Sequence, residues 1–189
     1  MKVIFLDVDG VLVHSNYENL DTCDIDPTKV ELLKCICDET DAVTVISSSW
    51  RGINYNHTPK CYDVLRSVLA SASIPVLGNT PFSESSQRAK EIKEWMLSQR
   101  GCIESFVIFD DEDWNWKDYG FERNWIQTSF DEGGLTKEHA DHAICLLGKF
   151  TQGQNKTTPI VGVVGGDHSQ FKATYMSLIS RGYTLDIGS

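Results

Sequence analysis

The length, composition and charge of the chain exclude several classes of protein. The chain has 189 residues, of which 41% are hydrophobic and 23% are charged, and its net charge is −10. These values are typical of a globular protein with one domain, and an acidic surface disfavours general affinity for nucleic-acid backbones. The sequence contains no apolar run of membrane-spanning length and no signal-peptide pattern at its start. We therefore expect a cytoplasmic protein that binds no membrane.

The first predicted element is a short buried strand that ends in two acids. Residues 3–6 are continuously apolar, and Asp7 and Asp9 follow them directly. Burying an unpaired charge is costly, so a core strand does not normally end in a pair of carboxylates. This pair of acids is therefore a candidate functional site.

Helix and strand then alternate along the chain. An Asp-Pro pair at 26–27 is typical of a helix start, and a Thr-Pro pair at 58–59 repeats that pattern. Between them, the run AVTVI at 42–46 predicts a second strand, which is followed by three serines at 47–49. The alternation is typical of a sheet whose strands are connected by helices.

The second half of the chain continues this pattern. The predicted elements are a strand at 74–77, a helix at about 85–99, a strand at 106–109, a strand at 125–128 and a helix that Thr136 caps. The strand at 106–109 also ends in acids, Asp110 and Asp111. Two separate strands therefore place paired carboxylates at their carboxyl ends.

The predicted fold class is α/β, a doubly wound, Rossmann-like parallel sheet with helices on both faces. Strands that are apolar on both sides favour this class over a half-exposed antiparallel sheet. Ligands bind such sheets at the carboxyl ends of the strands, near the point where the strand order reverses. We assign residues 1–149 to a catalytic core and residues 150–189 to an extension, which either completes the core or starts a further region.

The acids at the strand ends indicate a metal site. If Asp7, Asp9, Asp110 and Asp111 meet at one edge of the sheet, they repel one another and raise one another's pKa values. A bound Mg²⁺ removes this repulsion, prefers oxygen ligands and commonly pairs with a substrate phosphate. The alternative is two unrelated turns in which an Asp caps the backbone. Two acidic strand ends in one chain favour the metal site.

Four motifs in order resemble the haloacid dehalogenase-like (HAD) superfamily of phosphotransfer enzymes. They are DVDG at 7–10, Ser47 after the second strand, a cation at the start of a helix, and the acidic pair at 110–111. Arg88 is the expected cation and Lys90 is the alternative. The resemblance covers roughly residues 1–148 and implies the fold predicted above.

The resemblance implies a Mg²⁺-dependent phosphomonoester phosphatase that works through an aspartyl-phosphate. Asp7 would be the nucleophile, and Asp9 would act as general acid and then as general base. The resemblance also implies that Mg²⁺ is held by Asp7, by the backbone carbonyl of Asp9 and by Asp111, with Asp110 nearby.

The same resemblance assigns the residues that bind the phosphate. Ser47, or Ser48 in its place, and Arg88 would bind the phosphoryl oxygens. Gly10 would allow a sharp turn whose amide groups face the phosphate.

The connections of the predicted core leave no room for a sizeable cap domain. The segments 11–41 and 50–87 hold little more than the predicted core elements. An uncapped site is open, which favours a macromolecular substrate over a small metabolite. The stretches SSSWR, EIKEWM, FDDEDW and GLTKEHADHAICLL are also similar to a compact HAD branch found in RNA-repair and phage proteins.

Charge and aromatic content favour a phosphoprotein, with phosphotyrosine first, over a polynucleotide end or a nucleotide. The acidic chain disfavours a groove that tracks a nucleic-acid backbone. Trp50, Arg51 and Trp114 are the expected substrate contacts. The aromatic rings alternatively cover the edge of the core, and Arg51 alternatively forms a salt bridge within a loop.

Two further expectations concern redox state and activity. The six cysteines show no paired CxxC spacing, so we expect reduced thiols in a reducing compartment. A non-catalytic phosphate-binding domain, or a receiver-like module, is the alternative from another functional class. A receiver would need its acceptor Asp at the end of a middle strand, whereas the second strand here ends in serines.

Overall fold

A five-stranded parallel sheet is the centre of the structure, a computed structural model that describes residues 1–16, 23–51, 59–83 and 87–148. Its strands are β1 (Lys2–Leu6), β2 (Val43–Ile46), β3 (Val76–Asn79), β4 (Ser105–Asp110) and β5 (Trp125–Gln127). Their order across the sheet is β3-β2-β1-β4-β5, and every neighbouring pair is parallel. The predicted fold class is confirmed.

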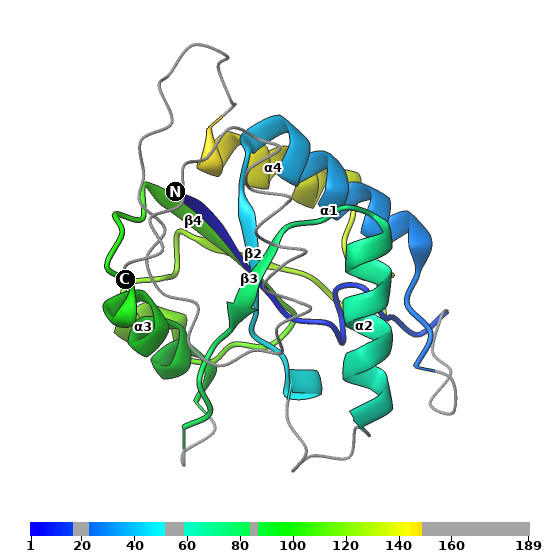
Figure 1. Cartoon of the computed structure of the whole chain (residues 1–189), viewed down its shortest axis with the longest axis horizontal. Helices are drawn as coiled ribbons and strands as arrows, with labels where there is room; N and C mark the ends of the chain where they lie inside the picture. The colour runs from blue at the N-terminus through cyan, green and yellow to red at the C-terminus, as the bar shows by residue number, and fades with distance from the viewer. Residues whose placement is uncertain (17–22, 52–58, 84–86, 149–189) are drawn as a thin grey trace, which may run out of the picture.

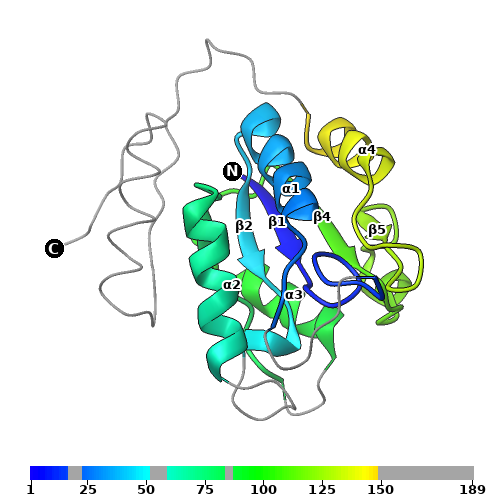
Figure 2. The same cartoon turned by 90° about the vertical axis from the view of Figure 1, so that its right-hand side faces the viewer.

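Helices cover both faces of the sheet. They are α1 (Pro27–Thr40), α2 (Pro59–Ser71), α3 (Arg88–Ser98) and α4 (Lys137–Leu147), with the short 3-10 helices η1 (Ser49–Arg51) and η2 (Trp116–Tyr119). The helices α1, α2 and α4 share one hydrophobic core, whereas α3 and η2 pack in a second core. Figure 1 shows α3 on the opposite side of the strands from α1 and α4, and Figure 2 gives the view turned by 90°.

The central strand β1 contributes side chains to both cores, which explains why its apolar run is unbroken. Ile4 and Leu6 point into the core of α1, α2 and α4, whereas Val3 and Phe5 point into the core of α3. All four side chains are fully buried. The ring of Trp95 on α3 packs edge-on against Phe5 with 5.4 Å between centroids.

The predicted helix starts are present where the chain is described. Asp26 caps α1, because its side chain accepts the N–H of Thr28 at 2.8 Å and Pro27 occupies the first helical position. Thr136 caps α4 by accepting the N–H of His139 at 3.3 Å, and His139 Nδ1 accepts the N–H of Thr136 in return. Such reciprocal bonds satisfy donors that a helix start leaves free.

Strand β3 lies two residues later than predicted, at Val76–Asn79 instead of 74–77. The N–H of Ile74 donates to the carbonyl of Leu69 at 2.9 Å, and Ser73 has a positive φ of 56°. Ile74 therefore closes the end of α2. An apolar residue buried at a helix end resembles the first residue of a strand when only hydropathy is considered.

The strand order positions the functional edge of the molecule. From β1 the chain winds outward to β2 and β3, and it then returns to place β4 on the other side of β1. Neighbouring connections at β1 therefore run in opposite directions, which opens a crevice at the carboxyl ends of β1 and β4. Within the described ranges, no cap domain covers this edge.

The expectation of six reduced thiols is wrong for two of the cysteines. Cys23 and Cys61 form a disulfide with 5.2 Å between their Cα atoms, while four other cysteines are free. The pair is 38 residues apart in sequence, and the fold brings the segment before α1 against the first turn of α2. A search for local Cys spacing does not detect such a pair. The inference of a reducing compartment required all six thiols to be free, so the structure does not support it.

In the described part of the chain, every helix is too short or too polar to cross a membrane. The boundary predicted between residues 149 and 150 falls within the segment 149–189, which lies outside the described residues. The domain division therefore stays a prediction.

Candidate active site

Three carboxylates meet at the carboxyl ends of β1 and β4. Asp7 follows β1, Asp110 ends β4, and Asp111 comes next in the chain. The Asp7 N–H donates to the carbonyl of Phe109 at 3.0 Å, which extends the pairing of the two strands to the site. One carboxylate oxygen from each acid lies within 4.8 Å of the others. The sequence prediction that these acids share one edge is correct for Asp7, Asp110 and Asp111.

Arg88, in the first turn of α3, forms ion pairs with two of these acids. Its Nη1 contacts Asp7 Oδ2 and lies 2.9 Å from Asp110 Oδ2, and the residue is buried. Burial lowers the pKa of Arg88, but the charges of Asp7 and Asp110 together outweigh this and raise it above the ordinary value. The alternative cation, Lys90, lies half-exposed and pairs with Glu94 at 3.8 Å. Of the two candidates, only Arg88 reaches the carboxylates.

Burial and mutual repulsion act on the acids of β4. Burial and the charge of Asp7 raise the pKa of Asp110 well above its usual range, although Arg88 opposes this. The same two causes raise the pKa of the half-buried Asp111 to about 6. Asp110 Oδ1 also accepts the N–H of Glu112 and the indole N–H of Trp114, each at 3.0 Å. Asp110 is therefore held by donors, whereas Asp111 is more open.

The donor set fits a hard divalent cation. Three carboxylates against one guanidinium leave this cluster with excess negative charge when all are ionised. The ligand atoms are oxygens only, which suits Mg²⁺ and excludes the thiolate-rich sites that soft metals prefer. A cation in this position would offset the repulsion that raises the pKa values of Asp110 and Asp111.

Ser47 presents a buried hydroxyl beside β1. Its N–H donates to the carbonyl of Leu6 at 2.8 Å, which fixes the residue next to Asp7. It is 1% exposed, and its Oγ has no hydrogen-bond partner among the described residues. The Oγ of Ser48, by contrast, accepts the N–H of Trp50 at 3.3 Å. The geometry therefore favours Ser47 over Ser48 as the residue whose hydroxyl is available to bind a ligand.

Gly10 stands at a turn position where the site requires a glycine. Its φ is +70°, and a Cβ there would lie 2.2 Å from Oδ2 and Cγ of Asp111. Any side chain would therefore displace Asp111 as well as strain the backbone. In the same turn, the Val8 carbonyl accepts the N–H groups of Val11, Leu12 and Val13.

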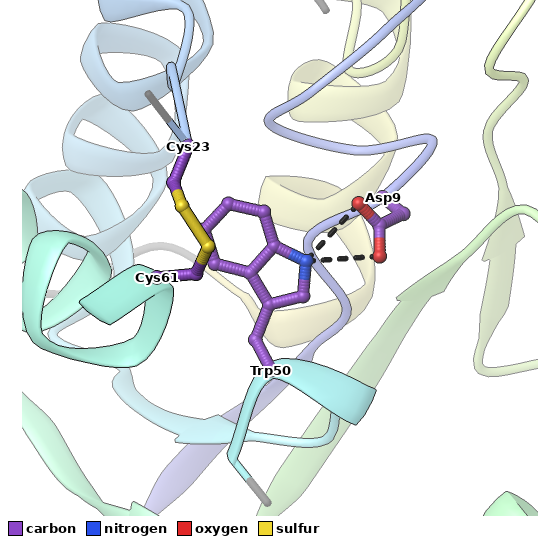
Figure 3. The surroundings of a disulfide bond; sticks show 4 residues. All are labelled: Asp9, Cys23, Trp50 and Cys61. Carbon is purple, nitrogen blue, oxygen red and sulfur yellow. Dashed lines mark hydrogen bonds between the residues drawn. A yellow bond between two sulfur atoms is a disulfide. The ribbon is translucent and has the colours of Figure 1, made fainter. Parts of the chain in front are cut away.

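Asp9 is held apart from the three-carboxylate cluster. Its two carboxylate oxygens accept the indole N–H of Trp50 at 3.1 and 2.9 Å (Figure 3). The carboxylate of Asp9 is not a member of the group formed by Asp7, Asp110 and Asp111. The expected metal contact through the Asp9 carbonyl stays a prediction.

Two of the expected substrate contacts are buried side chains. Trp50 is 3% exposed, and the Arg51 side chain is 2% exposed. The Arg51 guanidinium forms an ion pair with Glu91 on α3 and donates to the carbonyls of Ser48 and Thr80. Both polar ends are occupied within the protein, which favours the alternative of structural side chains, and a direct substrate contact of Trp50 or Arg51 stays a prediction.

The third expected contact, Trp114, lies at the site. It is half-buried, its indole N–H donates to Asp110, and its ring lies 5.0 Å from the Arg88 guanidinium carbon. Both contacts orient charged groups of the cluster. Its role as a substrate contact stays a prediction.

Sequence reasoning missed two buried hydroxyls at the same edge of the sheet. Thr80 and Thr128 follow β3 and β5, are each 3% exposed, and have no hydrogen-bond partner for Oγ1 among the described residues. Thr128 also lines a cavity of about 420 Å³ that begins at Asp111. The other lining residues are Gln127, Ser129, Phe130, Asp131 and Glu132. Thr80 lies three residues after the strand predicted at 74–77, and Thr128 is the last residue of the strand predicted at 125–128, so neither stood out as a hydroxyl at a strand end.

The comparison with family models identifies the family. One model matches residues 3–140, and it describes the HAD domain in Swiss Army Knife RNA repair proteins. The searches of curated proteins and of solved structures gave no match. The matched region is more than half of the chain and contains the whole three-carboxylate cluster. The chain therefore belongs to the family of HAD domains of Swiss Army Knife RNA repair proteins.

Proposed function

We propose that the protein is a Mg²⁺-dependent phosphomonoester phosphatase that transfers the phosphoryl group to Asp7. The observation that carries this proposal is the meeting of Asp7, Asp110 and Asp111 with Arg88 beside the buried Ser47 hydroxyl. A nucleophile, an oxygen-only metal site and phosphate-binding groups are the parts that such a transfer needs. The family match supports a phosphatase-type reaction.

Each residue has a separate role in the proposal. Asp7 attacks phosphorus and forms an aspartyl-phosphate, and Asp9 protonates the leaving oxygen. Asp9 then deprotonates the water that hydrolyses the intermediate. Ser47 and Arg88 bind the phosphoryl oxygens. Mg²⁺, held by Asp7 and Asp111, would offset the negative charge that a carboxylate and a phosphate bring together.

The substrate we propose is the phosphorylated end of a polynucleotide. The family description names RNA repair proteins, which supports an RNA end over the phosphoprotein that the sequence alone favoured. In the described ranges no cap domain covers this edge, and such an open edge admits the end of a large molecule. A single terminal phosphate also requires no extended basic groove, so the net charge of −10 does not oppose this substrate.

A phosphoprotein is the second candidate because the cavity beside the site is acidic. Asp111, Asp131 and Glu132 line it, and these acids would repel further phosphates of a nucleic acid. A peptide with one phosphate avoids that repulsion. The two substrate classes therefore differ in what they place near these three acids.

The test is phosphate release from a matched panel with and without Mg²⁺. The panel contains 5′- and 3′-phosphorylated RNA ends, phosphotyrosine peptides and nucleotides, and Asp7→Asn is the inactive control. We expect Mg²⁺-dependent release that is fastest from RNA ends. Faster release from phosphopeptides would select the second candidate. No release from any substrate or from p-nitrophenyl phosphate, or full activity of Asp7→Asn, would refute the proposed chemistry.

A further inference from the structure

The ring of Trp50 is fixed in place by the core. Trp50 belongs to the hydrophobic core that includes Cys23, Cys61 and Leu65, and it is 3% exposed. Figure 3 shows the benzene side of the indole next to the Cys23–Cys61 disulfide, while the N–H edge points the other way, toward Asp9. A buried ring with a covalently crosslinked neighbour has little freedom to rotate. Its N–H therefore has a fixed direction.

That fixed N–H contacts both oxygens of a single carboxylate. The distances from Trp50 Nε1 are 3.1 Å to Asp9 Oδ1 and 2.9 Å to Asp9 Oδ2. An indole N–H is a donor only, so it orients the carboxylate and takes no part in proton transfer. Asp9 stands in the turn that follows Asp7, and Trp50 comes from η1, 41 residues later. The contact thus joins two separate segments at the site.

The indole donor favours one orientation of the Asp9 carboxylate. The charges of Asp9 and Asp111 interact, so the two carboxylates repel each other when both are ionised. Loss of the indole donor would remove two of the contacts that hold Asp9 in this orientation. A group that transfers protons must stay within hydrogen-bond reach of the reacting oxygen, and misplacement by about 1 Å costs on the order of 100-fold in rate.

We propose that Trp50 is a positioning residue that holds Asp9 in the orientation needed for proton transfer, an inference that rests on the proposed phosphatase function. Trp50 touches no substrate in this assignment. It acts only through Asp9, and the core that contains the disulfide fixes its direction.

The first test compares two leaving groups in Trp50→Phe, which keeps an aromatic ring and removes the N–H. p-Nitrophenol leaves readily without a proton, whereas an alkoxide leaves only when it is protonated. Because Asp9 also serves the hydrolysis of the intermediate, which is common to both substrates, the comparison uses kcat/KM, which reports formation of the aspartyl-phosphate. We expect kcat/KM to fall roughly 10- to 100-fold on an alkyl phosphate and less than about threefold on p-nitrophenyl phosphate. An equal loss on both substrates, or no loss on either, would overturn the assignment.

Two control variants separate positioning from general damage to the core. Trp95→Phe removes an indole from the core of α3. It should change neither the rates on the two substrates nor the ratio between them. If Trp50 acts through Asp9, the double variant Trp50→Phe/Asp9→Asn should be no slower than Asp9→Asn alone. Additive losses in the double variant would contradict the proposal.

A measurement without substrate distinguishes failure of this inference from failure of the phosphatase function. In nitrogen-labelled protein, the indole N–H resonance of Trp50 should move in Asp9→Ala, while that of Trp95 stays in place. If the wild type releases no phosphate but this shift occurs, the contact stands and the proposed reaction is refuted. If the resonance does not move, the contact itself is refuted, whatever the activity.

Discussion

Two buried arginines show how differently the molecule treats charge at its core and at its functional edge. Arg51 meets one acid, Glu91, and three backbone carbonyls, so charge and donors are balanced. Arg88 faces Asp7 and Asp110, with Asp111 beside them. Burial and the charge of Arg88 lower the pKa of Arg51, although Glu91 opposes this, whereas two carboxylates raise the pKa of Arg88.

This difference separates a structural ion pair from a ligand site. The Arg51–Glu91 pair connects η1, the residues after β3 and α3, because Glu91 also accepts the N–H of Ser83 at 2.8 Å. It is complete within the chain. The Arg88 cluster has excess negative charge and lies beside a buried hydroxyl that has no partner among the described residues, and the Mg²⁺ and phosphate of the proposed function would satisfy both.

The largest effect is expected from a substitution in the cluster of Arg88 and the three carboxylates. Arg88→Met keeps the bulk of the side chain and removes the charge that would bind the phosphoryl group. We expect kcat to fall on the order of 100- to 1,000-fold, as for the loss of a transition-state donor in other enzymes. Steady-state kinetics with saturating Mg²⁺ measure this. Retention of more than half of the activity would show that Arg88 has no role in the reaction.

The next largest effect is expected from breaking the Arg51–Glu91 ion pair. Glu91→Gln leaves the Arg51 guanidinium buried without its counter-charge, which should lower the free energy of unfolding by about 3–5 kcal/mol. Glu94→Gln on the same helix is the matched control, because its pair with Lys90 is half-exposed and worth less than about 1 kcal/mol. Urea unfolding compares the two variants. Restoration of the lost stability by Mg²⁺ would contradict the division between the two arginines.

A smaller effect concerns the crosslink beside Trp50. Cys61→Ser opens the Cys23–Cys61 bond, which spans 38 residues, and should cost roughly 2–4 kcal/mol of unfolding free energy. Urea unfolding of the wild type with and without a reductant is the parallel measurement. Cys102→Ser, at an exposed free cysteine, is the control and should leave stability unchanged. Equal behaviour of the two variants would mean that Cys23 and Cys61 are not joined.

The smallest effect is a shift of thermal stability with pH in metal-free protein. The pKa values of Asp110 and Asp111 are raised on folding, the second to about 6. Groups of this kind contribute stability below their unfolded pKa and lose it as pH rises through the folded value. In EDTA, Tm should therefore fall between pH 5 and 7.

Adding Mg²⁺ gives a second comparison of Tm at the two pH values. Since the metal replaces protons on the acids, it should raise Tm more at pH 7 than at pH 5. Asp111→Asn removes one of the titrating groups and should flatten both trends. A Tm that rises with pH in EDTA, or a Mg²⁺ effect that is equal at both pH values, would be inconsistent with this cluster.

Hydropathy and end signals were sufficient to predict the fold. Apolar runs at β1 and β4 and the caps at Asp26 and Thr136 are local, so they can be read from neighbouring residues. The acids were identifiable because charged residues at the ends of core strands are energetically unusual. Parallel strands then place those ends at one edge of the sheet, which brings Asp7 and Asp111 together.

The contacts that could not be predicted all join distant segments. The Arg51–Glu91 pair spans 40 residues, the Trp50–Asp9 contact 41, and the Cys23–Cys61 bond 38. No local sequence pattern indicates which tryptophan or arginine side chain is buried in the fold. The sequence therefore left open whether Trp50 and Arg51 contact substrate or are structural, whereas packing of η1 against α2 and α3 buries both.

The pairing of β1 with β4 has a consequence for how the protein is made. Phe5 pairs with Ile108, so β1 leaves the ribosome about a hundred residues before its neighbour β4. Until then, one edge of an apolar strand stays open to wrong partners. The three-carboxylate cluster thus forms only after β4 has been synthesised, and a nascent chain that stops before β4 carries an aggregation risk without this cluster.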